Sequence, residues 1–522
     1  MTTFSIHVRK QPDDERSPEE LLKSSLHHAS FSNMHLIRES VDARKKDRVW
    51  QEYQLAFDAD PGSPEICTAL KDQTIRPMIP APFEPPERDI EIRKNPLIIG
   101  FGPSGMFLGL QLARLGLAPI VLEQGEPIEQ RWKSVQSLWK KGELNPQSNM
   151  HFGEGGAGTF SDGKLTAYKQ SFLNRRILEE FYRAGGPEDI LYKAKPHLGT
   201  DYLRKVVGNF RKEIQDSGGE VRFGHRFDDL RLEKGRVEGV VVNGEYHPLR
   251  QIFLCIGNSA RSTFRMLFGK GVAMEAKPMA VGLRIEHPRD FIDTRQYGTW
   301  KSYLPAAEYK LTAQIRERGV YSFCMCPGGF IVCTATEAGG VVTNGMSYHS
   351  RKSPYSNSAL VATVSSSDYP SKHPLSGFEF QHHLEQAAYS APRVPFTAPV
   401  QRCSDFLKGQ VSRGSIPCSY QPDVNPGDLG ALLPCFLTQA IQEGLIQFEK
   451  KIRGFVERGV LVGVETRTSS PVRILRNVHC ESINTGGLYV FGEGAGYAGG
   501  IMTSALDAYR FSLRVKGKRG CS

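Results

Sequence analysis

Residues 95–124 read NPLIIGFGPSGMFLGLQLARLGLAPIVLEQ and contain each part of a dinucleotide-binding βαβ unit. An apolar run at Leu97–Ile99 predicts a short buried strand, and a helix is predicted over Met106–Arg114. Between them lies a G-x-G-x-x-G turn made of Gly100, Gly102 and Gly105. Because the amides at the start of such a helix favour phosphate charge, we expect a dinucleotide at this turn.

The glycines and the acid that follows them have separate expected roles. Gly100 permits the tight bend, Gly102 lets the backbone approach a pyrophosphate, and Gly105 allows the helix to pack closely. A second strand is predicted over Pro119–Leu122, and Glu123 at its end is placed to accept a hydrogen bond from an adenosine ribose hydroxyl. With strand, helix, second strand and acid all present, an ordinary glycine-rich turn is the weaker interpretation. The other predicted contacts of this unit are Pro103, Ser104 and Gln124.

A second glycine-rich stretch lies at residues 487–500, which read GLYVFGEGAGYAGG. A hydrophobic strand precedes Gly492 and Glu493, and an apolar helix is predicted from Ile501 to Phe511, directly after Gly500. This stretch resembles the second FAD motif of flavoproteins with two dinucleotide-binding domains. The resemblance implies that Glu493 bonds the ribityl chain and that the helix points its N-terminus at the flavin.

A separate NAD site is the competing interpretation of this stretch, because Gly494, Gly496 and Gly499 also match G-x-G-x-x-G. Only 23 residues follow Gly499, too few for the helix, second strand and acid of another βαβ unit. We therefore expect two halves of one FAD site, distant in sequence and adjacent in space.

Two segments between these motifs resemble segments of the same superfamily of flavoproteins. Residues 250–257 (RQIFLCIG) predict a buried strand that ends at Gly257, where such flavoproteins return the chain past the cofactor. Residues 220–242 resemble the small β-meander that precedes this strand. The resemblance implies that the backbone of Phe227 meets the adenine.

Residues 151–166, HFGEGGAGTFSDGKLT, follow a helix predicted over Ile128–Lys141 and place five glycines within eleven residues. Such a composition exposes backbone N–H groups to an anion or to the edge of a ring. We expect this loop to lie along the flavin. Its predicted cofactor contacts are Gly155, Gly156 and Ser161.

Four further motifs carry a specific resemblance: SVDARKKD (40–47), YSFCMCPGG (321–329), GVVTNGMS (340–347) and ETRTSSPVR (465–473). Together with the glycine-rich stretches they resemble, over nearly the whole chain, the family of uncharacterised FAD-dependent dehydrogenases of bacteria and plastids. The resemblance implies an α/β protein with a glutathione-reductase-like Rossmann FAD domain, an inserted substrate domain and a small N-terminal domain. It implies FAD and supplies no substrate.

The chain divides into four predicted segments. Residues 1–88 form an α+β domain that ends in a proline-rich linker over residues 77–86, residues 89–270 and 444–522 form the FAD domain, and residues 271–443 form an insert with a mixed sheet over the flavin face. The strands expected outside the FAD domain are Phe4–Val8, Met34–Val41, Val49–Phe57, Val281–Ile285 and Phe330–Thr334, and the helices are Pro18–Leu26 and Phe378–Ala388.

Composition agrees with a globular protein of two or three domains. The chain has 522 residues, 39% of them hydrophobic and 23% charged, without a transmembrane run or a targeting sequence. Ten cysteines without a C-x-x-C pattern favour reduced thiols in the cytoplasm. The net charge of +10 is spread along the chain, which argues against nucleic-acid binding, and no metal site is predicted.

Candidate catalytic groups are side chains that could take a proton or orient a substrate beside the flavin. Lys164 and Asp162 come just after the glycine-rich loop, where Lys164 would stabilise reduced flavin or steer a carboxylate; a structural ion pair between the two is equally compatible. Arg467 and Arg473 would bind a substrate carboxylate bidentately, unless they contact FAD phosphates or another domain. We therefore expect a dehydrogenase or oxidase of a small substrate with an acidic group; the alternative is a flavoprotein that acts on RNA or through a protein partner.

Cys324 and Cys326 raise the alternative of a redox-active thiol pair. Disulfide-exchanging flavoproteins of this superfamily carry their thiols in the first glycine-rich loop, and the corresponding loop here has no cysteine. The sequence therefore favours a buried core position or the lining of a substrate pocket for both residues.

Overall fold

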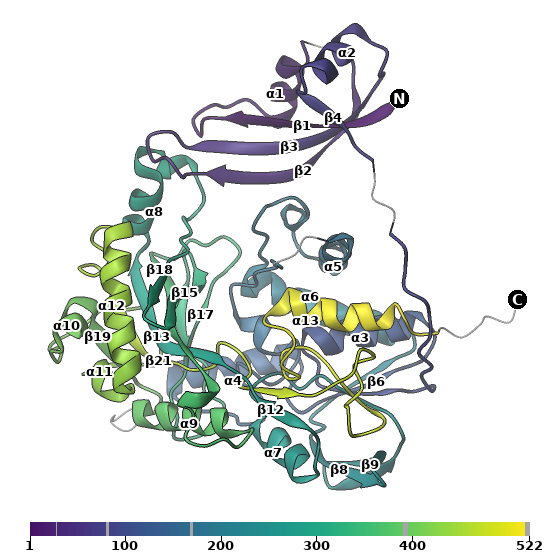
Figure 1. The fold of residues 1–522 in the computed structure, drawn as a ribbon, viewed down its shortest axis with the longest axis vertical. Coiled ribbons are helices and arrows are strands. Elements are labelled where there is room, and N and C mark those ends of the chain that lie inside the picture. The colour runs from purple at the N-terminus through teal and green to yellow at the C-terminus, as the bar shows by residue number, and fades with distance from the viewer. Residues whose placement is uncertain (28, 80–82, 168–170, 390–394, 517–522) are drawn as a thin grey trace, which may run out of the picture.

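The computed structural model describes residues 1–27, 29–79, 83–167, 171–389 and 395–516. Three groups of strands organise an α/β architecture: a small N-terminal sheet, a parallel sheet, and a larger sheet built mainly from the insert (Figure 1). No helix in these ranges is long and apolar enough to cross a membrane. Part of the predicted proline-rich linker, residues 80–82, lies outside the described residues.

The N-terminal domain is a four-stranded antiparallel sheet with two helices, in the order β-α-β-β-α-β. Its elements are β1 (Thr2–Lys10), α1 (Pro18–Ser25), β2 (Ser32–Asp42), β3 (Trp50–Ala59), α2 (Pro64–Lys71) and β4 (Ile75–Pro77). The sheet order β2-β3-β1-β4 is that of the ferredoxin-like split βαβ motif. The predicted strands and α1 are confirmed, whereas α2 and β4 were not predicted because they are short and bounded by turn residues.

The N-terminal domain joins the rest of the protein along the edge of β2. The Glu39 amide donates to the Tyr192 carbonyl at 2.9 Å, and the Ala194 amide donates to the Glu39 carbonyl at 2.8 Å. The domain is thus held by main-chain hydrogen bonds as well as by its linker.

A five-stranded parallel sheet gathers strands from both ends of the chain. In spatial order it contains β23 (Leu488–Val490), β11 (Ile252–Leu254), β5 (Leu97–Ile99), β6 (Ile120–Glu123) and β7 (Glu220–Phe223). The expected adjacency of residues 97–99, 252–254 and 488–490 is therefore confirmed. Helices α3 (Pro103–Arg114) and α13 (Ile501–Ser512) pack against each other, and the Ser104 hydroxyl donates to the Ser504 carbonyl at 3.0 Å.

The β-meander begins later than predicted. It consists of β8 (Phe227–Glu233), β9 (Arg236–Val242) and β10 (Glu245–Pro248), whereas β7 pairs in parallel with β6. The segment 220–223 thus belongs to the parallel sheet, because its edge position beside β6 satisfies its backbone. Helix α4 (Ile128–Lys141) has its predicted bounds.

Further helices pack in this part of the chain. They are α5 (Phe172–Arg183), α6 (Gly199–Asp216) and α7 (Arg261–Gly269), with the 3₁₀ turns η1 (Ala157–Phe160) and η2 (Glu188–Leu191). Phe107, Phe181 and Phe210 pack in mutual ring contact between α3, α5 and α6. Arg114 at the end of α3 pairs with Glu180 of α5 at 2.8 Å.

The inserted domain is built on a seven-stranded mixed sheet. In spatial order its strands are β14 (Thr312–Ile315), β15 (Arg318–Cys326), β18 (Tyr355–Val364), β13 (Met279–Pro288), β21 (Val460–Glu465), β19 (Ala398–Arg402) and β20 (Val424–Pro426). Only β19 and β20 pair in parallel. The predicted helix is present as α9 (Ser376–Tyr389), and the predicted strand near residue 330 forms a hairpin of β16 (Phe330–Cys333) and β17 (Thr343–Met346).

The remaining elements flank these sheets. They are α8 (Arg289–Tyr297), η3 (Gly298–Tyr303), η4 (Ser366–Asp368), α10 (Cys403–Lys408), α11 (Leu429–Leu432), α12 (Cys435–Lys451), β12 (Met274–Ala276) and β22 (Val472–Ile474). Helix α12 lies along the outer face of the insert sheet (Figure 1).

The second boundary of the insert lies later in the chain than predicted. The expected return to the FAD domain at residue 444 is wrong, because β21 lies between β13 and β19 and α12 packs on β14 and β15. The insert sheet therefore extends to Glu465, and the chain returns to the parallel sheet at β23.

Gly105→Ala should destabilise the protein by about 3 kcal/mol, the upper end of overpacking costs. A Cβ at this position would overlap the carbonyl oxygen of Gly100. Thermal unfolding followed by circular dichroism measures the change. Gly208→Ala, at a half-buried position of α6 where an added Cβ would meet only the Arg211 side chain at 3.8 Å, is the control and should raise stability by about 0.5–1 kcal/mol. Equal midpoints for the two variants would contradict the close approach of α3 to the turn.

Candidate functional site

A long cavity lies at the carboxyl ends of the parallel strands and reaches the insert sheet. Ile99, Glu123, Cys255 and Phe491 line it at the ends of four strands, the position at which open α/β sheets bind ligands. Most of the predicted site residues line this one cavity: Gly100, Gly102, Pro103, Ser104, Glu123, Gln124, Gly156, Ser161, Asp162, Lys164, Phe227, Gly257, Arg467, Glu493, Gly500 and Ile501.

Three predicted cofactor glycines lie behind the cavity wall instead. A Cβ on Gly105, Gly155 or Gly492 would overlap the Gly100 carbonyl, the Thr159 hydroxyl or the Ser104 hydroxyl. These glycines therefore permit close packing of the segments that form the wall, and the contact of Gly155 and Gly492 with the cofactor stays a prediction.

Other glycines open the cavity itself. A Cβ on Gly257, Gly499 or Gly500 would meet no protein atom within 4 Å, and one on Gly102 would meet only the Gly156 Cα at 3.8 Å. Backbone rather than side chains thus lines these parts of the wall. Two helices also begin here, α3 after Gly102 and α13 after Gly500, and their first amides favour phosphate or a polar ring edge.

Glu123 is buried at the end of β6 and connects three segments. Its carboxylate accepts hydrogen bonds from the backbone amides of Phe101 at 2.9 Å, Gly125 at 3.0 Å and Gly153 at 2.9 Å. A carboxylate has about four acceptor positions, so one remains for a ligand hydroxyl. Its contact with a ribose stays a prediction.

The glycine-rich loop is organised by Arg131, which sequence reasoning missed. This fully buried side chain of α4 donates to the carbonyls of Asn149 and Gly156, both at 2.9 Å, and lies over the Phe160 ring. Burial lowers the pKa of Arg131 to about 10, still well above neutral pH. The signal was available, because position 131 continues an apolar helical stripe formed by Ile128, Val135 and Leu138.

His151 also lines the cavity. Its Nδ1 contacts the Ser259 hydroxyl at 3.0 Å, and its buried Nε2 has no protein partner among the described residues. Burial and the charge of Arg467 hold the pKa of His151 well below its ordinary value. The imidazole is therefore neutral at physiological pH.

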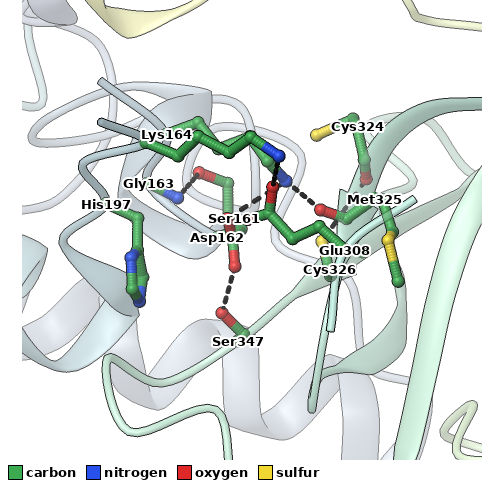
Figure 2. Close-up of polar contacts among 12 residues, drawn as sticks. Ser161, Asp162, Gly163, Lys164, His197, Glu308, Cys324, Met325, Cys326 and Ser347 are labelled. Atoms are coloured by element: carbon green, nitrogen blue, oxygen red, sulfur yellow. Dashed lines mark hydrogen bonds and ion pairs between the residues drawn. The ribbon is translucent and has the colours of Figure 1, made fainter. Parts of the chain in front are cut away.

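Asp162 and Lys164 form an ion pair at 3.1 Å, as the structural interpretation of these residues anticipated (Figure 2). Asp162 also accepts two hydrogen bonds from Arg351, at 3.1 and 2.6 Å, and one from the Ser347 hydroxyl at 2.5 Å. Burial raises the pKa of Asp162, but Lys164 and Arg351 more than offset that effect and hold it below its ordinary value. An ionised, fully bonded carboxylate is a poor base, so we withdraw Asp162 as a catalytic group.

The two predicted arginine anchors do not converge. Arg467 is buried, binds Glu385 through two nitrogens at 3.0 and 2.9 Å, and donates from its third to Thr336 at 2.7 Å. Arg473 lies outside the cavity lining, pairs with Glu275 at 2.9 Å and lies over the Tyr497 ring. Since these guanidinium groups already have protein partners, we withdraw both as carboxylate anchors.

Glu385 sits between two buried arginines. Besides Arg467 it binds both terminal nitrogens of Arg261, at 2.9 and 2.8 Å. Burial raises the pKa of Glu385, but the two arginines outweigh it and lower that pKa to about 2. This triad fixes the wall of the cavity beside His151.

The insert contributes a wall of the cavity, and of its residues the sequence analysis named only Cys324 as a candidate for pocket lining. Phe323, Cys324, Asn344 and Glu465 line the cavity from this side. Behind them, the fully buried Arg284 contacts Glu465 at 3.2 Å. Burial raises the pKa of Glu465 to about 7. A charged residue within the otherwise buried strand β13 was the available signal.

Comparisons with known proteins agree with the nature of this site. Residues 278–468 match the family model described as FAD-dependent protein, C-terminal domain-like. A protein of Clostridium beijerinckii (strain ATCC 51743 / NCIMB 8052), named Uncharacterized protein, is 43% identical over 508 residues, which cover 94% of each chain. The chain is FAD-dependent, and it belongs to the same family as the Clostridium protein.

The solved structures to which this chain is similar are distant from it. CtdE in complex with FAD has 10% identity, coverage of 80% of this chain and 82% of that chain, and a TM-score of 0.32. The tetracycline destructase Tet(55) has 11% identity, coverage of 80% of this chain and 79% of that chain, and a TM-score of 0.34. A geranylgeranyl bacteriochlorophyll reductase-like protein of Thermoplasma acidophilum has 10% identity, coverage of 80% of this chain and 77% of that chain, and a TM-score of 0.33.

Glu385→Gln should lower the free energy of unfolding by about 3–5 kcal/mol, because it leaves the buried Arg467 without a counter-charge and the buried Arg261 with only the half-exposed Glu337. Urea unfolding followed by tryptophan fluorescence measures the loss. Glu337→Gln is the matched control, since that half-exposed carboxylate also pairs with Arg261, at 3.2 Å, and its removal should cost under about 1 kcal/mol. Similar losses in both variants would contradict the special position of Glu385.

Proposed function

We propose that this protein is an FAD-dependent dehydrogenase with a glutathione-reductase-like arrangement, which oxidises a small organic substrate by hydride transfer to the flavin. The observation that carries the proposal is the continuity of the cavity. It extends from the glycine turn and Glu123 to the wall formed by Cys324, Asn344 and Glu465 of the insert.

The two ends of the cavity suit different parts of FAD. The start of α3 and the open space at Gly102 suit the pyrophosphate, Glu123 suits the ribose, and His225 with Phe227 suits the adenine. The opposite end, at Lys164 and the start of α13, is left for the isoalloxazine. The substrate would then lie between the flavin and the insert sheet.

Bound FAD supplies the two-electron acceptor of the reaction. Glu465 is the candidate proton acceptor, because it faces the cavity and its pKa of about 7 is matched to neutral conditions. Arg284 holds it in place at 3.2 Å. Lys164 remains as the cation at this end of the cavity and favours negative charge on the reduced flavin or on an acidic substrate.

Gly102→Val should abolish FAD retention while leaving the protein folded. The side chain fits the protein, since its Cβ would have only an ordinary contact at 3.8 Å, but it would occupy the space assigned to the pyrophosphate. FAD released by heat and measured by absorbance should be about one per chain in the wild type and absent in the variant. Gly208→Ala should keep its FAD. A colourless wild-type protein that takes up no FAD, or a yellow Gly102→Val, would overturn the assignment.

NADH and NADPH should reduce the bound flavin slowly or not at all. In the described residues the turn over Gly494–Gly499 leads into α13 without a following strand in the parallel sheet, so it does not build a second nucleotide site. Anaerobic stopped-flow mixing follows the bleaching of the visible absorbance band of the flavin. Bleaching within seconds would favour a reductase that takes electrons from a nicotinamide.

A further inference from the structure

Strand β15 delivers two thiols to the Lys164 end of the cavity. Cys324 lines the cavity, and Cys326, two residues later, is buried (both are labelled in Figure 2). The pairing of β15 with β18 changes register between Phe323 and Cys326, and Cys324 has a φ of 44°. The chain is therefore not an extended strand here, and the Cys326 sulfur lies 3.5 Å from the Cys324 carbonyl oxygen.

Cations surround this turn from two sides. The Lys164 ammonium donates to the Met325 carbonyl, between the two cysteines (Figure 2). From the opposite side, Arg284 donates to the Cys324 carbonyl at 2.8 Å and to the Cys326 sulfur at 3.4 Å. A left-handed residue that is neither glycine nor asparagine is strained, and such strain tends to occur where a site requires it.

The two thiols differ in acidity. A hydrogen bond from Cys326, with the charges of Lys164 and Arg284, outweighs burial and lowers the pKa of Cys324 to about 6. The same bond and burial hold the pKa of Cys326 well above its ordinary value. By contrast, burial raises the pKa of Cys418, away from these cations, to about 12. At neutral pH this pair thus contains one thiolate and one thiol.

We propose that Cys324 and Cys326 are a dithiol–disulfide couple that exchanges two electrons with FAD. The proposal rests on the proposed placement of the isoalloxazine at the Lys164 end of the cavity. Cysteines two residues apart can be bridged where the backbone turns, because a disulfide needs a Cα separation of about 4.4–6.8 Å. The break in β15 provides that turn.

The exchange balances without another reactant. The Cys324 thiolate and the Cys326 sulfur form one S–S bond, the S–H bond of Cys326 breaks, and two electrons with that proton pass to FAD, which becomes the reduced flavin anion. One negative charge moves from the Cys324 sulfur to the flavin. Lys164, held by Asp162 at 3.1 Å, faces that charge before and after the step and is the positioning residue.

Counting electrons tests the proposal. The purified holoprotein is oxidised with ferricyanide, desalted and titrated anaerobically with dithionite while flavin absorbance is followed. Four electrons per FAD are expected for the wild type and two for Cys324→Ser and for Cys326→Ser. Cys435→Ser, at an exposed position of α12, is the control and should still accept four.

The outcomes separate the two proposals. Yellow wild-type protein that accepts two electrons overturns the dithiol couple and leaves the FAD assignment standing. Four electrons in Cys324→Ser or Cys326→Ser would also overturn it, because another group would then hold them. Protein that is colourless and takes up no FAD overturns both proposals.

The pH dependence of alkylation provides a second test that needs no flavin chemistry. Iodoacetamide labelling of Cys324 in the reduced holoprotein, read by peptide mass spectrometry, should rise with a midpoint near pH 6, since the thiolate is the nucleophile. Lys164→Met should move the midpoint upward by about one pH unit, because it removes a neighbouring positive charge. A wild-type midpoint above about pH 8, the range of an ordinary cysteine, would contradict the thiolate.

Discussion

One buried carboxylate, Asp162, joins the glycine-rich loop to the inserted domain. It accepts hydrogen bonds from Arg351 and Ser347 of the insert and forms an ion pair with Lys164 of its own loop. A buried charge is tolerated only when it is paired and hydrogen-bonded, so the loop and the insert must meet in this register. The wall of the cavity, the direction of Lys164 and the surroundings of Cys324 all follow from that requirement.

Local patterns predicted the parts of the fold that lie within one segment. The βαβ unit at residues 97–123, helix α4 and the strand and helix around Gly492 were identified because strand, turn and helix signals stand in sequence order. The adjacency of β5, β11 and β23 was also predicted, since a known arrangement links their motifs.

Pairings between distant side chains were not predictable in the same way. Arg467 was assigned to a substrate, yet its carboxylate is Glu385, 82 residues earlier in the chain. Nothing in the local sequence of either residue indicates the other. The end of the insert was misplaced for a similar reason, because β21 is a central strand only once β13 and β19 are beside it. Arg131 and Arg284 are different cases from Arg467. Each interrupts an apolar pattern, so its buried position could have been predicted from the sequence.

The attachment of the N-terminal domain has a consequence for how the family varies. Its seam with the main body includes hydrogen bonds between the backbone of Glu39 and that of Tyr192 and Ala194. Main-chain atoms are the same in nearly every residue. The side chains along this seam can therefore change during evolution while the N-terminal domain stays in place. An alignment of relatives should show little covariation between residues on the two sides of the seam, although the interface itself is preserved.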